Sequence, residues 1–112
     1  MNTINRENAI LSSFLWSDDT GIDKSEAFIL DENIFTSSFR RDVAAKINDE
    51  TKGEKYYGFL NVTLSDHTPR TKHELEFMDI TAQSSMPFSV SKRYHTALKK
   101  EYMKRKAGFL NG

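Results

Sequence analysis

The chain has 112 residues, no cysteine and a formal net charge of zero, with 16 Lys and Arg against 16 Asp and Glu. This length fits one domain, 1–112, with a small hydrophobic core, and the lack of cysteine excludes disulfides and thiolate metal sites. No apolar run approaches the ~20 residues that span a bilayer, and the first residues lack the apolar stretch of a signal peptide. We therefore expect a cytoplasmic protein without a membrane partner.

The charges are unevenly spread along the chain. Residues 1–87 contain nine Lys and Arg and fifteen Asp and Glu, for a net charge of −6, whereas residues 88–112 contain seven Lys and Arg and only Glu101, for a net charge of +6. A basic end on an acidic body predicts an interaction surface. The alternative is that the basic segment folds back and neutralises the body, since helix C-termini favour cations in any case.

The first predicted helix runs from Asn5 to Trp16, where apolar residues recur with helical spacing. This stripe consists of Ile10, Leu11, Phe14 and Leu15. Asn5 is a suitable N-cap, and Glu7 lies in the first turn, where the helix dipole favours an anion. The polar cluster at 17–21 ends the helix.

A second apolar segment, 22–30, predicts a short helix capped by Asp23 or Ser25. The polar residues 31–33 then form a turn that leads into the next helix.

The helix at 35–47 is predicted to be the central one, against which the other segments close. Its apolar residues recur every four positions and stack on one face. They are Phe35, Phe39, Val43 and Ile47. Thr36, Ser37 or Ser38 is expected to cap the start of this helix, and the polar residues 48–53 are expected to close it.

Two weaker patterns follow. Residues 54–64 fit a helix, but Leu60, Val62 and Leu64 also alternate with polar residues as in a strand. We favour the helix because no second segment offers a strand to pair with it. A further helix is predicted to begin near Pro69, with Thr68 as its cap. Thr71 and Glu74 also fit a capping box for a start at Lys72. The residues that it is expected to bury are Leu75, Met78 and Ala82, with Phe77 or Ile80 on a flank.

The last helix is the longest, predicted over 88–107 with Gly108 as its stop. Its apolar stripe consists of Val90, Tyr94, Ala97 and Leu98. The same face continues through Glu101 and Arg105. Contact with the body is therefore expected to end near Leu98, and the last turns are expected to project beyond the body.

The residues supply no recognisable catalytic or metal site. The histidines are His67, His73 and His95, and no two of them have the i, i+4 spacing of a helical metal pair. Glycine-rich phosphate loops, Gly-x-Ser-x-Gly and HExxH are absent from the sequence. We therefore expect a binding domain rather than an enzyme, with no cofactor and no metal.

The candidate binding residues all lie on the last helix. They are Lys92, Arg93, Lys99, Lys100, Tyr102, Met103, Lys104 and Arg105. These cations are suited to nucleic-acid phosphates, although the negative charge of 1–87 opposes such binding. Aromatic residues, Met and Arg are enriched at protein interfaces. The composition therefore favours a protein partner, with nucleic acid as the alternative.

Three stretches resemble one known family. Residues 5–15 resemble the opening helix of the helicase-binding domain at the C-terminus of bacterial primases, and of the replicative-helicase N-terminal domain that shares its fold. Residues 28–47 resemble the next stretch of both, and residues 87–106 resemble the basic final helices of the primase version. The residues that carry the likeness within 28–47 are Asn33, Ile34, Phe35, Phe39, Arg40 and Arg41.

The helices predicted along the chain give an all-α fold, a single irregular bundle of about six helices with a long basic C-terminal helix. The resemblance implies a module of DNA replication that binds the N-terminal domain of the replicative DNA helicase through Tyr102, Met103 and the cations around them. The chain is then either a small phage or plasmid relative or a part of a larger replication protein, whose parent is a DNA primase. Residues 54–64 and 68–71 match no feature of the family.

Overall fold

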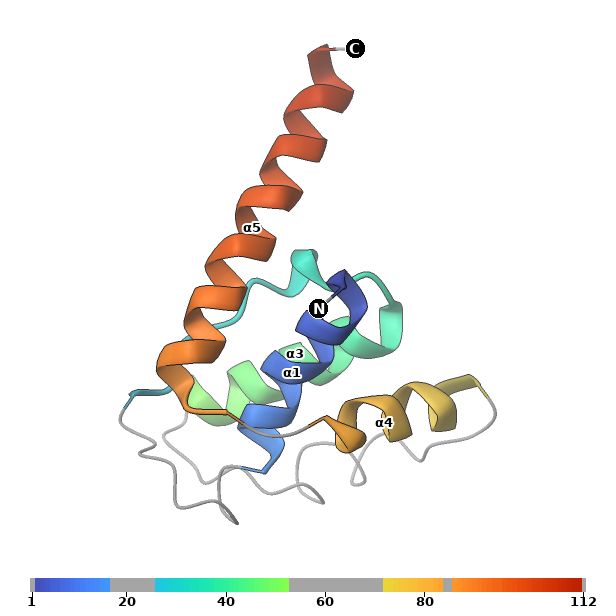
Figure 1. Cartoon of the computed structure of the whole chain (residues 1–112), viewed down its shortest axis with the longest axis vertical. Coiled ribbons are helices and arrows are strands. Elements are labelled where there is room, and N and C mark those ends of the chain that lie inside the picture. Colours follow the sequence, from blue (N-terminus) through green and yellow to red (C-terminus); the bar gives the residue numbers. More distant parts are fainter. Residues whose placement is uncertain (1, 17–25, 53–71, 84–85, 112) are drawn as a thin grey trace.

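The computed structural model describes residues 2–16, 26–52, 72–83 and 86–111, whose regular structure is helical throughout (Figure 1). The elements are α1 (Thr3–Leu15), the short 3-10 helix η2 (Glu32–Ile34), α3 (Ser38–Lys52), α4 (Lys72–Ala82) and α5 (Phe88–Asn111). The predicted all-α class is thus confirmed for these ranges. They contain four α-helices, and the helix predicted at 54–64 lies outside the described residues.

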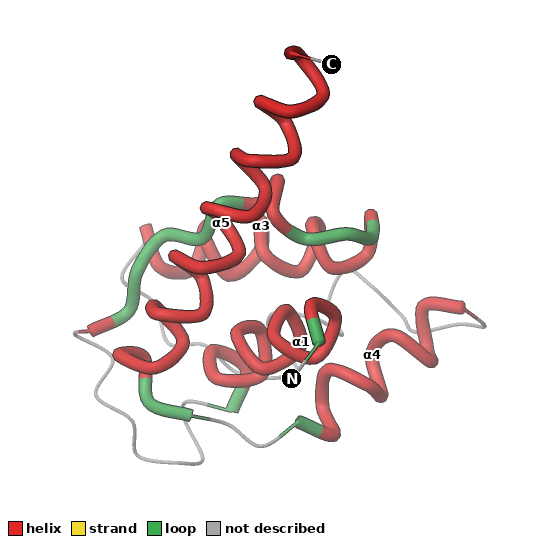
Figure 2. The backbone as a smooth tube through the Cα atoms, turned by 45° about the horizontal axis from the view of Figure 1, so that its top comes forward, coloured by secondary structure: helices red, strands yellow, loops and turns green. Residues whose placement is uncertain are grey.

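The middle of the bundle is occupied by α1 and not by the predicted central helix (Figure 2). Every residue over 7–15 is buried, and α1 contacts α3, α4 and α5. Helical periodicity missed this because α1 buries polar residues whose partners are distant in sequence. Ser12 Oγ donates to the Gln83 carbonyl (2.9 Å), and the hydroxyls of Ser13 and Ser91 share a hydrogen bond (2.5 Å).

Side-chain caps determine where two of the helices begin. α1 begins at Thr3, because Asn2 Oδ1 accepts a hydrogen bond from the Asn5 N–H at 2.7 Å. The prediction of Asn5 as the cap was therefore wrong by one turn. At the start of α3, Ser37 Oγ accepts from the Arg40 N–H at 3.1 Å, so Ser37 is the cap among the three residues that the sequence offered.

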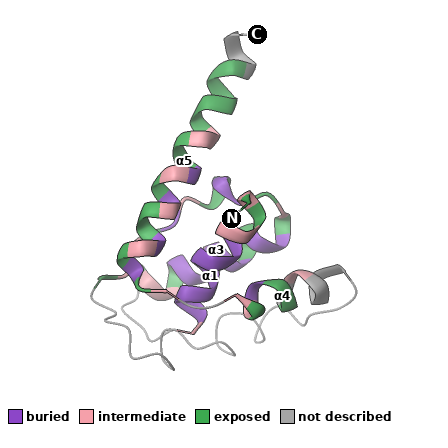
Figure 3. Ribbon diagram, viewed as in Figure 1, coloured by how far each residue is buried: buried purple, intermediate pink, exposed green. Residues whose placement is uncertain are grey.

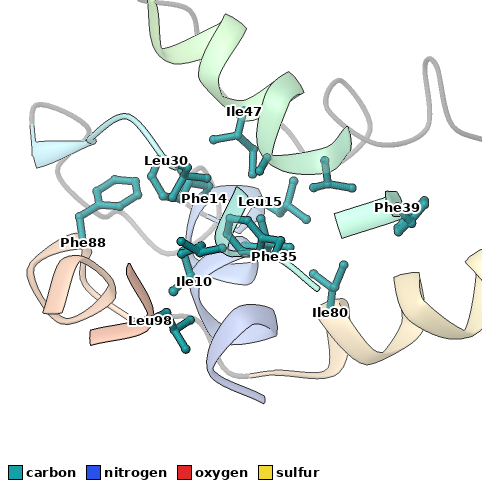
Figure 4. Packing of buried hydrophobic residues seen from close by; sticks show 14 residues of the cluster. Ile10, Phe14, Leu15, Leu30, Phe35, Phe39, Ile47, Ile80, Phe88 and Leu98 are labelled. Carbon is teal, nitrogen blue, oxygen red and sulfur yellow. The ribbon is translucent and has the colours of Figure 1, made fainter. Parts of the chain in front are cut away.

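The hydrophobic core lies where α1, α3 and α5 meet (Figure 4). The buried apolar face of α3 is confirmed, and its predicted members are Phe39, Val43 and Ile47. Phe35 is buried as well, although it precedes α3 and closes η2. Aromatic contacts join the helices, since the rings of Phe14 and Phe88 lie 4.7 Å apart. Burial of such large apolar side chains is the main stabilising contribution in a domain of this size.

In α4, Leu75 and Phe77 lie outside the described side chains, and the prediction is wrong for the other two residues expected to be buried. Ile80 is only 1% exposed, whereas Met78 is 56% exposed and Ala82 is also exposed. The face is set by Glu76, one turn before Ile80, because its carboxylate pairs with Arg40 at 3.3 Å. Both charged side chains of this pair are largely buried, so α4 is held by an ion pair as well as by apolar contact.

The segment 30–36 crosses the body and is held by side chains of the helices around it. Asn48 of α3 accepts from the Leu30 N–H (2.8 Å) and donates to the Leu30 carbonyl (2.9 Å). Glu7 of α1 accepts from the Thr36 N–H at 2.7 Å. Burial raises the pKa of Glu7, an effect that its hydrogen bonds to Thr36 oppose. The predicted short helix at 22–30 is wrong for residues 26–30, which form no α-helix.

α5 continues past the predicted stop at Gly108 and reaches Asn111. Glycine often follows the last turn of a helix, but here Gly108 lies within α5. Within the described residues, no α-helix combines the length and apolar character that crossing a membrane requires.

Candidate partner-binding groove on the C-terminal helix

The first half of α5 is part of the body (Figure 3). Its buried residues are Phe88, Ser91, His95 and Leu98. Leu98 was predicted to be buried, but Val90, Tyr94 and Ala97 are only half-buried. The buried face is rotated from the predicted one because two polar residues on it have partners inside the protein.

Contact between α5 and the body extends one turn beyond the predicted limit at Leu98. Tyr102 is half-buried and packs against the core cluster, and Glu101 pairs with Arg6 of α1 at 3.0 Å. Tyr102 is therefore attached to the body, and it is not the fully exposed anchor that the sequence suggested.

Beyond Tyr102, α5 projects away from the rest of the molecule (Figure 1). Every residue over 103–108 is exposed, and Met103 retains 54% of its accessible surface. An exposed Met among cations adds little to the stability of a single chain, but it is a common contact residue in binding surfaces. The predicted projection is thus present, and it begins at Met103.

A groove of about 580 Å³ runs along α5 where this projection begins. Its described lining residues are His95, Thr96, Lys99, Lys100, Met103 and Lys104. Four of the predicted binding residues therefore meet in one place, and the other four do not line the groove. Lys92 lines a separate hollow, Arg93 and Arg105 are exposed elsewhere on α5, and Tyr102 packs on the body.

The sequence analysis did not assign His95 and Thr96 to the site. A signal was nevertheless available, because each precedes a candidate lysine by four residues, and residues four apart share a helix face. His95 was considered only as a metal ligand. In the part of the chain that the structure describes, no group of three or more His, Cys, Asp or Glu side chains is placed to hold a metal ion.

His95 joins the groove to the segment 30–36. Its Nε2 atom accepts a hydrogen bond from the Asp31 N–H at 2.8 Å, and its ring lies 5.3 Å from the ring of Phe28. Burial lowers the pKa of His95, and the nearby charge of Lys99 lowers it further, whereas Asp31 raises it. The ring is therefore neutral at physiological pH, with Nε2 as acceptor and the proton on Nδ1.

The chain matches no protein-family model, no curated protein and no solved structure in the comparisons made. The functional interpretation therefore depends on the surface of α5 and on the resemblance noted in the sequence. This surface presents cations and one large apolar side chain, which is suited to binding.

Proposed function

We propose that this chain is a protein–protein interaction module of DNA replication and that α5 is its partner-binding element. The supporting observation is that α5 leaves the body after Tyr102. Met103 then keeps 54% of its accessible surface, and Lys99, Lys100 and Lys104 line the same groove. A well-exposed apolar anchor within a ring of polar residues is the usual form of a binding hot spot. The module is a binding domain and not an enzyme.

The proposed partner is the N-terminal domain of a replicative DNA helicase. This assignment comes from the resemblance of 5–15, 28–47 and 87–106 to the helicase-binding domain of bacterial primases. On this proposal, the complete domain is an irregular bundle of about six helices that ends in a long basic helix, and it works in the cytoplasm, in a primase or beside one.

The test is the affinity for a purified hexameric replicative helicase from the source cell, measured by isothermal titration calorimetry. The parent chain is expected to bind, and a chain that ends at Tyr102 is expected to lose most of the affinity while remaining folded. Unchanged affinity of the shortened chain would contradict the role of α5. No binding by the folded parent chain would contradict the choice of helicase.

Nucleic-acid binding is the second candidate, and the arrangement of the lysines favours it. Lys92, Lys99 and Lys106 are seven residues apart and lie along one side of α5, and all three are exposed. Such a row can neutralise phosphates, and the affinity should then fall steeply with salt. The charge of −6 on 1–87 opposes this binding, so we place it second. A salt titration with a single-stranded oligonucleotide distinguishes the two candidates.

A further inference from the structure

Among the described residues that line the groove, the polar groups are mainly hydrogen-bond donors and cations. Lys99, Lys100 and Lys104 contribute ammonium groups. Since His95 Nε2 already accepts from Asp31, the Nδ1 atom carries the ring proton, and no described residue accepts a hydrogen bond from it. The site therefore has donors to offer to an anionic ligand.

The other two described lining residues are Thr96 and Met103. The Thr96 hydroxyl donates to the Lys92 carbonyl at 2.9 Å, so its hydrogen is already engaged within α5. Met103 supplies an exposed apolar surface, with Lys99 four residues before it and Lys104 directly after it. The volume of about 580 Å³ is large enough for a few side chains of a ligand.

We propose that this groove binds an acidic segment of a partner protein, which places one apolar side chain on Met103 and carboxylates against Lys99 and Lys104. The proposal rests on the proposed function, because it names the kind of surface that α5 recognises. Carboxylates suit the ammonium groups of Lys99 and Lys104, because charge-assisted hydrogen bonds are stronger than neutral ones. The attraction of opposite charges accelerates the encounter, and the apolar contact slows dissociation.

Two observations favour a protein segment over nucleic acid at this site. Met103 lies among the cations, where an amphipathic peptide places an apolar side chain, whereas a nucleic acid bound through its phosphates alone leaves Met103 without a contact. A nucleic acid longer than the groove would also approach the body, where 1–87 carries a net charge of −6. A short acidic segment can stay on the projecting helix.

The test uses a fluorescein-labelled amphipathic peptide of about 14 residues, with Glu and Leu at helical spacing, and measures fluorescence anisotropy at about 0.15 M salt. We expect the double variant Lys99→Gln, Lys104→Gln to bind the peptide at least about 10-fold more weakly than the parent. The matched control is Arg93→Gln, Lys106→Gln, which removes two cations of α5 outside the groove. This control is expected to stay within about 2-fold of the parent.

Three further measurements separate specific binding from general attraction of charges. Met103→Ala is expected to weaken peptide binding about 5-fold or more, and a peptide with Gln in place of each Glu is expected to bind no better than background. A single-stranded oligonucleotide is expected to bind more weakly than the acidic peptide. The proposal would be overturned if the two double variants lost the same affinity for the peptide, or if Met103→Ala kept the parent's affinity. Tighter binding of the oligonucleotide than of the peptide, or no peptide binding by the parent, would also overturn it.

The groove and the helicase assignment can fail separately. In one case the parent binds helicase, the chain ending at Tyr102 does not, and the double variant Lys99→Gln, Lys104→Gln binds as well as the parent. Then α5 is the binding element and the groove proposal is wrong. If the acidic peptide binds in the expected order of variants and helicase does not bind at all, the groove proposal holds and the partner is another protein.

Discussion

The two halves of α5 have the same secondary structure and opposite surroundings. Over Phe88–Leu98, the helix buries four residues against the body, one of them an imidazole that accepts a backbone N–H. From Met103 to Gly108 it is exposed on all sides. Tyr102 and Glu101, which still contact the core cluster and Arg6, mark the boundary. One helix thus contains a part that stabilises the fold and a part that is available for binding.

This difference shows that the length of a helix does not indicate how much of it stabilises a domain. Helical stability in proteins comes mainly from packing of a buried face, and that face ends at Tyr102. Substitutions on the two sides of this boundary should therefore affect different measurements, with stability changing on one side and affinity on the other.

The largest effect is expected from Phe88→Ala, in the packed half. Phe88 is fully buried and its ring lies 4.7 Å from that of Phe14, so its removal should lower the free energy of unfolding by about 3–5 kcal/mol. Urea denaturation followed by circular dichroism measures this loss. Met103→Ala is the matched control in the projecting half, and it should change the free energy by less than about 0.5 kcal/mol. Equal losses in the two variants would abolish the distinction between the halves.

Tyr102→Ala tests where the packed half of α5 ends. Tyr102 is half-buried against the core cluster, so we expect a loss of about 1–2 kcal/mol, between those of Phe88→Ala and Met103→Ala. The double variant Tyr102→Ala, Met103→Ala should lose no more stability than Tyr102→Ala alone, because Met103 is exposed. An unchanged melting temperature for Tyr102→Ala would move the boundary back to Leu98.

A smaller effect is expected from protonation of His95. Its pKa in the folded state lies below the unfolded value of 6.5, so its contribution to stability is present above pH 6.5 and is lost as the pH falls from there toward the folded pKa. Protonation removes the acceptor for the Asp31 N–H, at a cost of up to about 1.5 kcal/mol.

The measurement is urea denaturation of the parent and of His95→Gln at a series of pH values below neutrality. The parent should lose more stability than His95→Gln over this range. Glu7 acts in the opposite direction, because its raised pKa favours the folded state below 4.5 and this contribution is lost as the pH rises through the folded pKa. The difference between the two proteins isolates His95, and identical pH profiles would show that its protonation does not matter for the fold.

The smallest effect on stability is expected from charge reversal in the groove. Lys99→Glu with Lys104→Glu changes two exposed residues, so the free energy of unfolding should change by less than about 0.5 kcal/mol. Association with an acidic partner should become slower, and the difference from the parent should be larger at low salt. Stopped-flow measurements at two salt concentrations test this. An unchanged association rate would argue against electrostatic attraction to this surface.

The sequence predicted the elements better than it predicted their faces. Periodic apolar residues located α1, α3 and α5, and the three predicted core residues of α3 that lie in the helix are buried. The buried faces of α4 and α5 could not be predicted in this way. Ser91, His95 and Glu76 are polar, and they face inward because Ser13, Asp31 and Arg40, all distant in sequence, satisfy them. Helical spacing contains no information about such partners.

The candidate site was predicted in part for a similar reason. The charge difference between 1–87 and 88–112 predicted an interaction surface at the basic end. Four of the eight candidate residues there line one groove. Tyr102 was assigned to the exposed part because its contact with the core cannot be read from α5 alone. His95 could have been assigned to the site from its spacing to Lys99. Its burial could not be predicted, because it depends on a backbone N–H that is 64 positions away.

The most direct test of the division of α5 is the free energy of unfolding of a chain that ends at Tyr102, compared with that of the complete chain. Since residues 103–108 are exposed, we predict that the two values agree within about 0.5 kcal/mol. A loss of about 2 kcal/mol or more, which is typical of removing buried side chains, would show that the projecting half stabilises the fold and would contradict the account.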